Sequence, residues 1–578
     1  MPSIRIILPV LVVVALSPVG ASVGRREPGA TTTTQDAALP ERARAGLRKA
    51  VAFYRTQVAT GGGYHFAYAE DLSYGRSEQS EGPMRVEIQR DGTPIVALAY
   101  LEAYEATGDR YYLDAAREVA LTLVKGQYCN GGWSYVIELD PARRAQQPYR
   151  ADGRCSQPTP PGADRPATLD DNVTQAAVRV LMRVDRDLGF TDAAIHDAAR
   201  FALDGLVKAQ YPNGAWPQRY ARFPDPAAFP VMRASYPESW PRTWPGGSYF
   251  EHYTFNDNSI ADAIDAMLEG ARIYNEPRYL ASAEKGGDFI LLAQMPDPQP
   301  GWAQQYDRQM HPAWARRFEP PSITGGEAQS VMRSLMLLYR ETGNRRYLEP
   351  LPRALAYYQR SLLPPADKPS EARRRACPGQ TPCAARFYEL KTNRPLYITK
   401  GTRVTALDQG AATVDGYELS YSDASVITHY AVLVSGAGFA NIEREFTQLQ
   451  ATTAASVRRP DRLRGLSPWS ESAAASGQRS VPDAARVQSI LDGMDARGAW
   501  VEEGTIGRAD RLVSVFAGRN LVVRLGGRTL PLNENDTLEV FNGPEPPRER
   551  IIRSRTFADH VGVLSGYLAP HRAAAGSR

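Results

Sequence analysis

The sequence predicts a mostly α-helical fold: an incomplete (α/α) barrel or toroid of about four helical hairpins with long loops, followed by a small α+β extension at the C-terminus. Three observations predict it. One type of segment recurs along the chain, apolar residues between its copies follow a helical period, and a turn-like link divides each of these stretches in two. Successive helical hairpins of this kind stack into barrels and toroids.

The recurring segment begins with Gln and ends with Trp. Residues 127–133 and 210–216 share the pattern Gln-Tyr-x-Asn-Gly-x-Trp, and residues 294–302 repeat it more loosely, from Gln-Met-Pro to Gly-Trp. We expect each copy to close one pair of helices and to lead into the next pair.

Stripes of apolar residues lie between these copies. They follow the i, i+3, i+4 spacing of one buried helix face. The stripes are Val173, Ala176, Ala177, Val180, Leu181 and Val184 in the second unit, and Ile260, Ala263, Ile264, Met267, Leu268 and Ala271 in the third.

The turn-like links fall at residues 107–111, 188–192, 274–279 and 342–347. The first helices of the four hairpins would run in parallel, so their N-termini would meet at one mouth of the barrel, where we expect the active site.

The composition narrows the class of protein. The 578 residues suffice for a large catalytic domain with an appendage, and 43% hydrophobic and 23% charged residues are typical of a globular protein. The formal charge of +4 is too small for a dedicated nucleic-acid binder. We predict a catalytic domain over residues 40–450 and an accessory extension over residues 480–578, with a β-hairpin formed by residues 512–516 and 521–525.

The N-terminus indicates export. Residues 1–22 combine Arg5, an apolar run over residues 6–16 and small residues near position 22, as in a cleaved signal peptide. A membrane anchor is the alternative, but a membrane-spanning helix needs about 20 apolar residues. We therefore expect a secreted or periplasmic monomer without stable membrane insertion after cleavage.

An oxidising compartment makes two structural disulfides plausible among four cysteines that lie as two close pairs in the sequence: Cys129, Cys155, Cys377 and Cys383.

Acidic and amide residues stand before two of the predicted first helices. Asp170-Asp171-Asn172 precedes the second hairpin, and Asn256-Asp257-Asn258 precedes the third. Helix capping is the simplest interpretation, because Asp and Asn satisfy free backbone amides at helix N-termini. The two segments hold more carboxylates and amides than two caps require, and such oxygen ligands suit Ca²⁺, although neither segment is an EF-hand loop. We therefore predict a calcium site.

Arginines and aromatic residues alternate at residues 216–220, 314–319 and 386–388. Arg pairs with a carboxylate through two hydrogen bonds, and an aromatic face stacks on a sugar ring, so the combination suits an acidic sugar. For the tryptophans, packing of the loops against the barrel is an equally good interpretation.

Together and in this order, these motifs resemble the pectate lyases of polysaccharide lyase family ten. The resemblance covers about residues 45–430 and rests on residues 171–175, 213–218, 254–258, 314–322 and 386–395. It implies an incomplete (α/α) toroid that cleaves the acidic polysaccharide polygalacturonate by β-elimination, with Ca²⁺ as the cofactor. It also implies that Asp171 and Asp257 stand at the calcium and substrate site with Asn172 beside them, and that Arg316 and Arg386 hold substrate carboxylates.

One segment departs from the family. Its members have Phe-Ser-Gly-Arg-Asp, whose arginine is taken as the catalytic base, where this sequence reads Tyr-Ile-Thr-Lys-Gly at residues 397–401. Lys400 aligns with that arginine, and Arg403 would fit only if the loop shifted. A lysine suits proton abstraction if burial near Ca²⁺ and Arg386 lowers its pKa. We therefore predict Lys400 as the base, with a surface lysine in a strand-like turn as the alternative.

Two other functions fit the same sequence. A glycoside hydrolase on an (α/α) scaffold would use two of Asp171, Asp257, Glu319 and Glu327 as acid and base, without calcium. A pectate-binding protein that has lost turnover would account for the altered segment at Lys400. An unsaturated product would distinguish the lyase from both.

Overall fold

The structure, a computed structural model, describes residues 33–156, 166–407, 411–427, 430–457, 481–506 and 548–575, together with the backbone of four strands between residues 515 and 541. The predicted export signal, residues 1–22, lies outside the described residues. Within the described part of the chain, no helix is long and apolar enough to cross a membrane.

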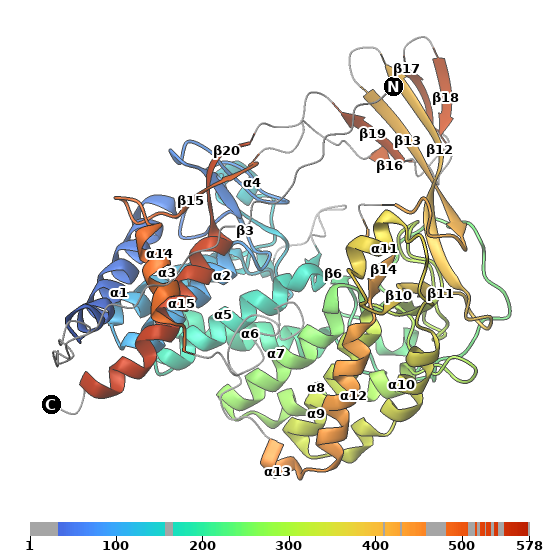
Figure 1. Ribbon diagram of the computed structural model, residues 1–578, viewed down its shortest axis with the longest axis horizontal. Coiled ribbons are helices and arrows are strands. Elements are labelled where there is room, and N and C mark those ends of the chain that lie inside the picture. The colour runs from blue at the N-terminus through green and yellow to red at the C-terminus, as the bar shows by residue number, and fades with distance from the viewer. Residues whose placement is uncertain are drawn as a thin grey trace, which may run out of the picture.

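Four helical hairpins form the body of the molecule (Figure 1). They are α2 (Thr93–Thr107) with α3 (Arg110–Gly126), α5 (Val173–Asp187) with α6 (Ala193–Ala209), α7 (Ser259–Tyr274) with α8 (Pro277–Ala293), and α9 (Glu327–Thr342) with α10 (Leu351–Arg360). The predicted mostly α-helical fold and its four hairpins are confirmed.

The links between the paired helices explain why the chain reverses there. Helices α2 and α9 end at Gly108 and Gly343, whose φ angles of 74° and 75° favour glycine and stop a right-handed helix. Asp109 caps the N-terminus of α3, and Asp192 caps the N-terminus of α6. Each of these carboxylates accepts hydrogen bonds from backbone amides of the first turn.

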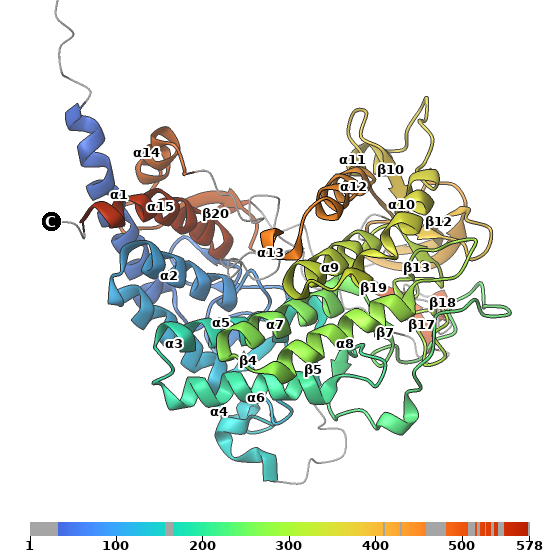
Figure 2. The same ribbon diagram turned by 90° about the horizontal axis from the view of Figure 1, so that it is seen from below.

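The first helices pack side by side in the order α2, α5, α7 and α9, and the second helices α3, α6 and α8 follow one another along one side of this row (Figure 2). At one end of the row, α12 (Ala437–Gln450) packs against α9. At the other end, α15 (Ser554–Ala575) packs against α2, and α1 (Thr33–Phe53) packs against α15. The array is therefore an incomplete toroid whose ends are formed by helices from outside the four hairpins.

A buried tryptophan closes each of the first three hairpins. The indole Nε1 of Trp133, Trp216 and Trp302 donates to a main-chain carbonyl of the preceding second helix, over 2.9, 2.8 and 2.9 Å. All three side chains are fully buried. The recurring Gln-to-Trp segment is thus a structural closure, and of the two interpretations of Trp216 the packing one is correct.

A further copy of this closure lies in the C-terminal segment. Trp500 donates to the carbonyl of Ile490 in α14 (Ala484–Asp492) over 2.8 Å. Strands β15 (Val501–Gly504) and β20 (Glu549–Arg553) follow, and β20 pairs with β1 (Ala67–Ala69) before leading into α15. The helical array therefore includes residues 481–506 and 548–575. Much of the expected accessory extension is one more repeat unit of the toroid, and it packs beside the N-terminal helices.

The strands between residues 515 and 541 belong to other sheets. The six-stranded sheet has the order β16 (Val515–Phe516), β19 (Thr537–Phe541), β13 (Ala411–Ser420), β12 (Pro395–Leu407), β11 (Phe387–Tyr388), β9 (Ile323–Thr324). The predicted pairing of residues 512–516 with 521–525 is wrong, because β16 pairs with β19 and β17 (Leu521–Leu525) pairs with β18 (Arg528–Leu532). The overlooked signal is the Gly526-Gly527 pair, which is typical of two-residue hairpin connections.

Two disulfides link Cys129 with Cys155 and Cys377 with Cys383. The described residues hold no free cysteine. Each bond joins cysteines that are close in sequence, so both stabilise local loops. The predicted disulfides are confirmed.

Candidate active site

Three of the hairpins are preceded by a short strand that ends in threonine: β5 (Ala167–Thr168), β7 (Tyr253–Thr254) and β9. In each case the threonine hydroxyl accepts a hydrogen bond from the backbone amide two residues further on, in Asp170, Asn256 and Gly326. This bond turns the chain sharply from strand to helix. The side chains in the turn are thereby placed at the same mouth of the toroid.

The turns before α5 and α7 each hold two consecutive residues in the left-handed region. The φ angles are 50° and 59° at Asp171 and Asn172, and 47° and 58° at Asp257 and Asn258. A left-handed backbone costs about 1–2 kcal/mol per residue, and such strain concentrates at functional sites. Asn172 and Asn258 occupy the N-cap positions, yet neither makes a side-chain cap hydrogen bond. Capping therefore does not explain these residues.

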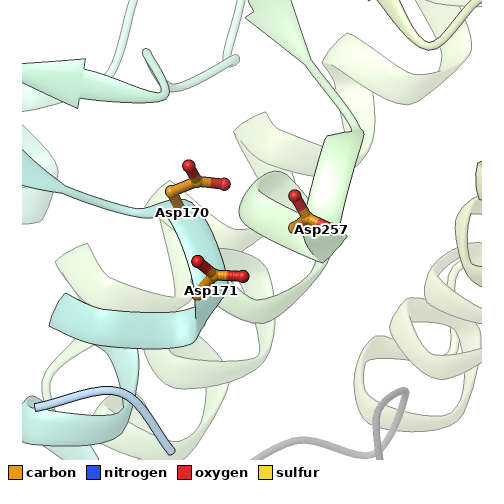
Figure 3. A group of neighbouring side chains, drawn as sticks. All are labelled: Asp170, Asp171 and Asp257. Carbon is orange, nitrogen blue, oxygen red and sulfur yellow. The ribbon is translucent and has the colours of Figure 1, made fainter. Parts of the chain in front are cut away.

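The two turns bring three carboxylates together (Figure 3). One oxygen each of Asp170, Asp171 and Asp257 lies within 4.8 Å of the others. Asp170 is buried, whereas Asp171 and Asp257 are exposed on their outer side. The surrounding protein still desolvates Asp257 in part and raises its pKa to about 8, and repulsion from Asp170 and Asp171 adds to the rise. Desolvation and repulsion from Asp170 likewise raise the pKa of Asp171 to about 6.

The oxygens around these carboxylates fit a hard divalent cation such as Ca²⁺. The amide of Gln89 donates to Asp171 over 2.9 Å. The Oε1 atom of Gln89 and the Oδ1 atom of Asp170 are buried without a hydrogen-bond partner. Calcium takes six to eight oxygen ligands, and a cation would relieve both the repulsion among the carboxylates and the lack of partners. Asp171 and Asp257, the predicted ligands, are therefore joined by Asp170 and approached by Gln89.

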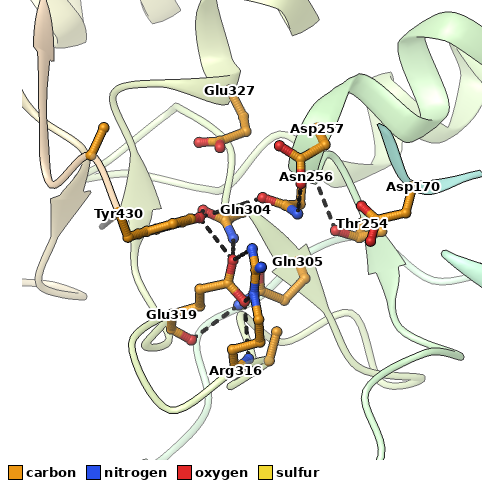
Figure 4. Close-up of polar contacts among 12 residues, drawn as sticks. Asp170, Thr254, Asn256, Asp257, Gln304, Gln305, Arg316, Glu319, Glu327 and Tyr430 are labelled. Carbon is orange, nitrogen blue, oxygen red and sulfur yellow. Dashed lines mark hydrogen bonds and ion pairs between the residues drawn. The ribbon is translucent and has the colours of Figure 1, made fainter. Parts of the chain in front are cut away.

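Two arginines from later loops approach this cluster, and Figure 4 shows one of them, Arg316, together with Asp170 and Asp257. Arg386 forms an ion pair with Glu327 and donates to Asn256 over 3.4 Å. Arg316 donates two hydrogen bonds to Glu319, over 2.6 and 2.8 Å. Both guanidinium charges oppose the rise in the pKa of Asp257, so they lie within its electrostatic reach.

Tyr430 lies between the two arginines, and sequence reasoning missed it. Its hydroxyl donates to Glu319 over 2.8 Å. The guanidinium carbons of Arg386 and Arg316 lie 4.0 and 5.2 Å from the centre of its ring, close enough for cation–π attraction. The ring therefore holds two like charges near one another. No motif around residue 430 signals this position, because the tyrosine reaches the site only through the fold.

The two glutamates considered for a hydrolase are committed to other partners. Burial alone would raise the pKa of Glu319, but the hydrogen bonds and the charge of Arg316 outweigh it and lower that pKa. Glu327 binds both Arg386 and the hydroxyl of Thr324. Each carboxylate thus serves to orient an arginine, which favours the lyase over a hydrolase built on these glutamates.

The remaining predicted site residues are Lys400 and Asn172. Lys400 lies in β12, where its backbone pairs with Tyr417 of β13, and its side chain lies outside the described residues. Asn172 is buried beside the carboxylates, at the start of α5. The structure therefore brings Asp171, Asp257, Asn172, Arg316 and Arg386 to one mouth, as predicted, while the role of each stays a prediction.

Residues 146–409 match the family model of the pectic acid lyases. The matched segment covers a little under half of the 578 residues. It contains both left-handed turns, both arginines and Lys400, so the predicted resemblance and the predicted class of enzyme, a pectate lyase, are confirmed. Gln89 and Tyr430 lie outside the matched residues. A search of curated proteins finds no significant match.

Solved structures with similar arrangements include a family 10 polysaccharide lyase from Cellvibrio cellulosa, which is 21% identical over 62% of this chain and 99% of that chain, with a TM-score of 0.39. A variant of that lyase in complex with trigalacturonic acid is 20% identical over 61% and 98% of the two chains, also with a TM-score of 0.39. Cellobiose 2-epimerase from Spirochaeta thermophila is 15% identical over 57% and 72%, with a TM-score of 0.34. Because these TM-scores are low, the structural similarities give no support beyond the match to the family model.

Proposed function

We propose that this pectic acid lyase is secreted or periplasmic and cleaves polygalacturonate by calcium-assisted β-elimination. The observation that carries the proposal is the combination at the mouth of three clustered carboxylates with two oriented guanidinium groups. Three carboxylates alone would repel a polyanionic substrate. With a divalent cation bound to them, the whole site would attract the carboxylates of the polymer.

The elimination can be written with the residues of this chain. A base removes the proton at C5, α to the uronate carboxylate; the C5–H electron pair becomes the C4–C5 double bond, and O4 departs with the leaving chain. Negative charge develops on the carboxylate in this step. Arg316 and Arg386, oriented by Glu319 and Glu327, would bind that carboxylate and stabilise the charge.

The proposed calcium ligands are Asp171 and Asp257, with Asp170 beside them. When bound, Ca²⁺ supplies additional positive charge for the substrate carboxylate. Buried Asn172 is proposed to shape the substrate site next to these ligands. Each of these residues sits on a turn fixed by the preceding threonine bond, so the site is preorganised.

Lys400 is proposed as the base. Arg316 and Arg386 are bonded to carboxylates, which stabilise the protonated guanidinium, so neither is prepared to accept a proton. A lysine near such positive charges loses its proton more readily than an isolated lysine does, because the neutral amine escapes their repulsion.

The main test is to incubate the mature protein with polygalacturonate, with and without a calcium chelator, and to follow the ultraviolet absorbance of the unsaturated product. We expect absorbance to rise only when calcium is present. New reducing ends without an unsaturated product would instead support a hydrolase. Binding without either product would support a pectate-binding protein that has lost turnover.

Variants test the base. Lys400→Ala should lower kcat by about 10²–10⁴-fold, the usual contribution of a general base, with little change in substrate binding. Lys368→Ala, at an exposed lysine, is the matched control. If Lys400→Ala keeps the wild-type kcat, the assignment of Lys400 as the base is wrong.

Export is supported by the composition of residues 1–22 and by the two disulfides, which persist in oxidising compartments. Mass determination of the exported protein should reveal cleavage near residue 22. Size-exclusion chromatography with light scattering should give the mass of a monomer.

A further inference from the structure

A buried glutamine connects the two left-handed turns that carry the carboxylate cluster. Gln175 lies in the first turn of α5, and its side chain is fully buried. Its amide nitrogen donates to the carbonyl of Leu169 over 2.9 Å and to the carbonyl of Ser259 over 3.2 Å. Leu169 directly precedes the turn before α5, and Ser259 directly follows the turn before α7. One amide group therefore holds the first turn against the second.

The connection continues from Ser259 to a carboxylate of the cluster. The hydroxyl of Ser259 donates to the carbonyl of Asn256 over 2.8 Å. The side-chain amide of Asn256 in turn donates to a carboxylate oxygen of Asp257. Asp171 and Asp257 come from different hairpins, so the separation of their carboxylates depends on hydrogen bonds that join the two turns.

Gln175 is the first member of a series of polar side chains on one face of α5. Residues 175, 179 and 183 are spaced by four, so they are neighbours along the surface of the helix. Arg179 and Arg183 form buried ion pairs with Asp265 and Glu269 of α7. The series therefore cross-links α5 to α7, and its member at the mouth is a neutral amide.

A neutral donor suits a place beside a cation site. An arginine there would neutralise part of the carboxylate charge and would repel a bound cation, whereas an amide binds the two carbonyls without adding charge. The Oε1 atom of Gln175 is buried without a hydrogen-bond partner among the described residues, which lowers stability. A bridge made at some loss of stability is typical of a functional site.

We propose that Gln175 is a positioning residue of the calcium site. It sets the separation between the carboxylates of Asp170 and Asp171 on one turn and that of Asp257 on the other, and Ser259 extends its effect to Asp257. The inference rests on the proposed function, in which these carboxylates bind Ca²⁺. A cation whose ligands are already in place does not have to order them on binding, so its affinity is higher.

Calorimetric titration of calcium chloride into the mature protein, freed of metal with a chelator, tests the proposal. Gln175→Met keeps the length of the side chain but removes both hydrogen bonds, and it should weaken calcium binding about tenfold. The formation of unsaturated product should need about tenfold more calcium to reach half its maximal rate. At saturating calcium, kcat should stay within about twofold of wild type, because excess calcium restores the occupied site.

Gln210→Met is the matched control. The amide of Gln210 also donates two hydrogen bonds, to the carbonyls of Gly214 and Ser282, both over 2.9 Å, and it joins the same two hairpins through their second helices. This variant should lose stability in urea unfolding but keep the calcium affinity of wild type. Equal calcium affinities for Gln175→Met and wild type, or equal losses of affinity in the two variants, overturn the positioning role even if the enzyme is a fully active lyase.

If Gln175→Met does not fold, Ser259→Ala decides. It removes only the hydroxyl that donates to Asn256 and should weaken calcium binding about threefold. Ser334→Ala, at a buried serine that donates to a carbonyl within α9, should leave the affinity unchanged. Wild-type affinity in Ser259→Ala then overturns the inference.

The two proposals fail in different ways. A wild type that binds calcium but forms no unsaturated product contradicts the proposed function, and the same titrations still decide the role of Gln175. A wild type that binds no calcium overturns the positioning role together with the calcium part of the proposed function.

Discussion

At the scale of single residues, the fold changes the acidity of ordinary aspartates. The pKa of Asp171 is raised to about 6 and that of Asp257 to about 8, because the neighbouring protein partly desolvates them and the three carboxylates repel one another. Proton binding by these groups therefore stabilises the folded state. This stabilisation is fully present below the ordinary aspartate pKa near 4 and is lost as the pH rises through about 6 and about 8.

The first prediction concerns pH and calcium. Without a cation, deprotonation of Asp171 and Asp257 should make the melting temperature lower at about pH 9 than at about pH 5. Added calcium should raise the melting temperature more at the higher pH, because there calcium does not have to displace protons from the carboxylates. Differential scanning calorimetry with chelator and with calcium measures both effects. Asp257→Asn should remove much of the pH dependence. A calcium effect that is equal at both pH values would contradict the assignment of the cluster.

Tyr430 allows the hydroxyl and the ring to be tested separately. Tyr430→Phe removes the hydrogen bond to Glu319 and should lower kcat/KM for polygalacturonate about tenfold, as expected for a bond to a charged group. Tyr430→Leu also removes the ring between the guanidinium groups and should cost about another fivefold. Steady-state kinetics at saturating calcium measures both. Tyr567→Phe is the control, and wild-type kinetics in Tyr430→Leu would show that the tyrosine does not position the arginines.

At the scale of elements, a strand, a threonine hydrogen bond and a strained turn are repeated before successive helices. The repetition explains why Asp171 and Asp257, 86 residues apart, reach the same point: each occupies the same place in its own hairpin, and adjacent hairpins lie side by side. The left-handed backbone at these turns is thus a property of the site and is absent from the turn at Glu327, which follows glycines instead.

The strained turn gives a prediction with an internal control. Asn258→Ala places alanine at a φ of 58° and should lower the free energy of unfolding by about 1 kcal/mol while weakening calcium binding; Asn258→Gly should cost less. Asn275→Ala carries the same backbone penalty, at a φ of 49°, but lies at the far end of α7. It should lose similar stability with unchanged calcium affinity. Urea unfolding measures the free energy of unfolding, and calorimetric titration measures the calcium affinity. Equal calcium affinities for Asn258→Ala and wild type would contradict the role of the turn in calcium binding.

At the scale of the whole molecule, segments near the two ends of the described chain pack together. Helix α15 covers α2, and β20 joins β1, so the toroid ends in helices contributed by the C-terminus. The long segment between β15 and β20 carries β19, which pairs with β13 in the hairpin that holds Lys400. The C-terminal part therefore supports both the helical array and the hairpin at the mouth.

This assembly predicts that the C-terminal repeat is required for stability. Trp500 is 5% exposed, and Trp500→Ala should lower the free energy of unfolding by about 3–5 kcal/mol in a single transition shared with the rest of the toroid. Val481→Ala, at a side chain that is 58% exposed, is the control. Circular dichroism during chemical unfolding measures the change. A protein truncated after residue 480 that melts like the full chain would show that the segment is accessory after all.

The sequence by itself determined the mostly α-helical class, the four hairpins, the expectation of two disulfides without their pairing, the family resemblance and the mouth where Asp171, Asp257, Arg316 and Arg386 meet. These features rest on periodicity, on repeats and on short motifs, whose information is local in the chain. Asp170 as a third carboxylate, Gln89 and Tyr430, and the partnership of each arginine with a glutamate were decided only by the tertiary structure.

The pairing of the strands near residue 520 and the place of the C-terminal repeat were also decided by the tertiary structure. The physical reason is that desolvation, ion pairing and strand pairing depend on which distant segments become neighbours, and no local pattern records that choice.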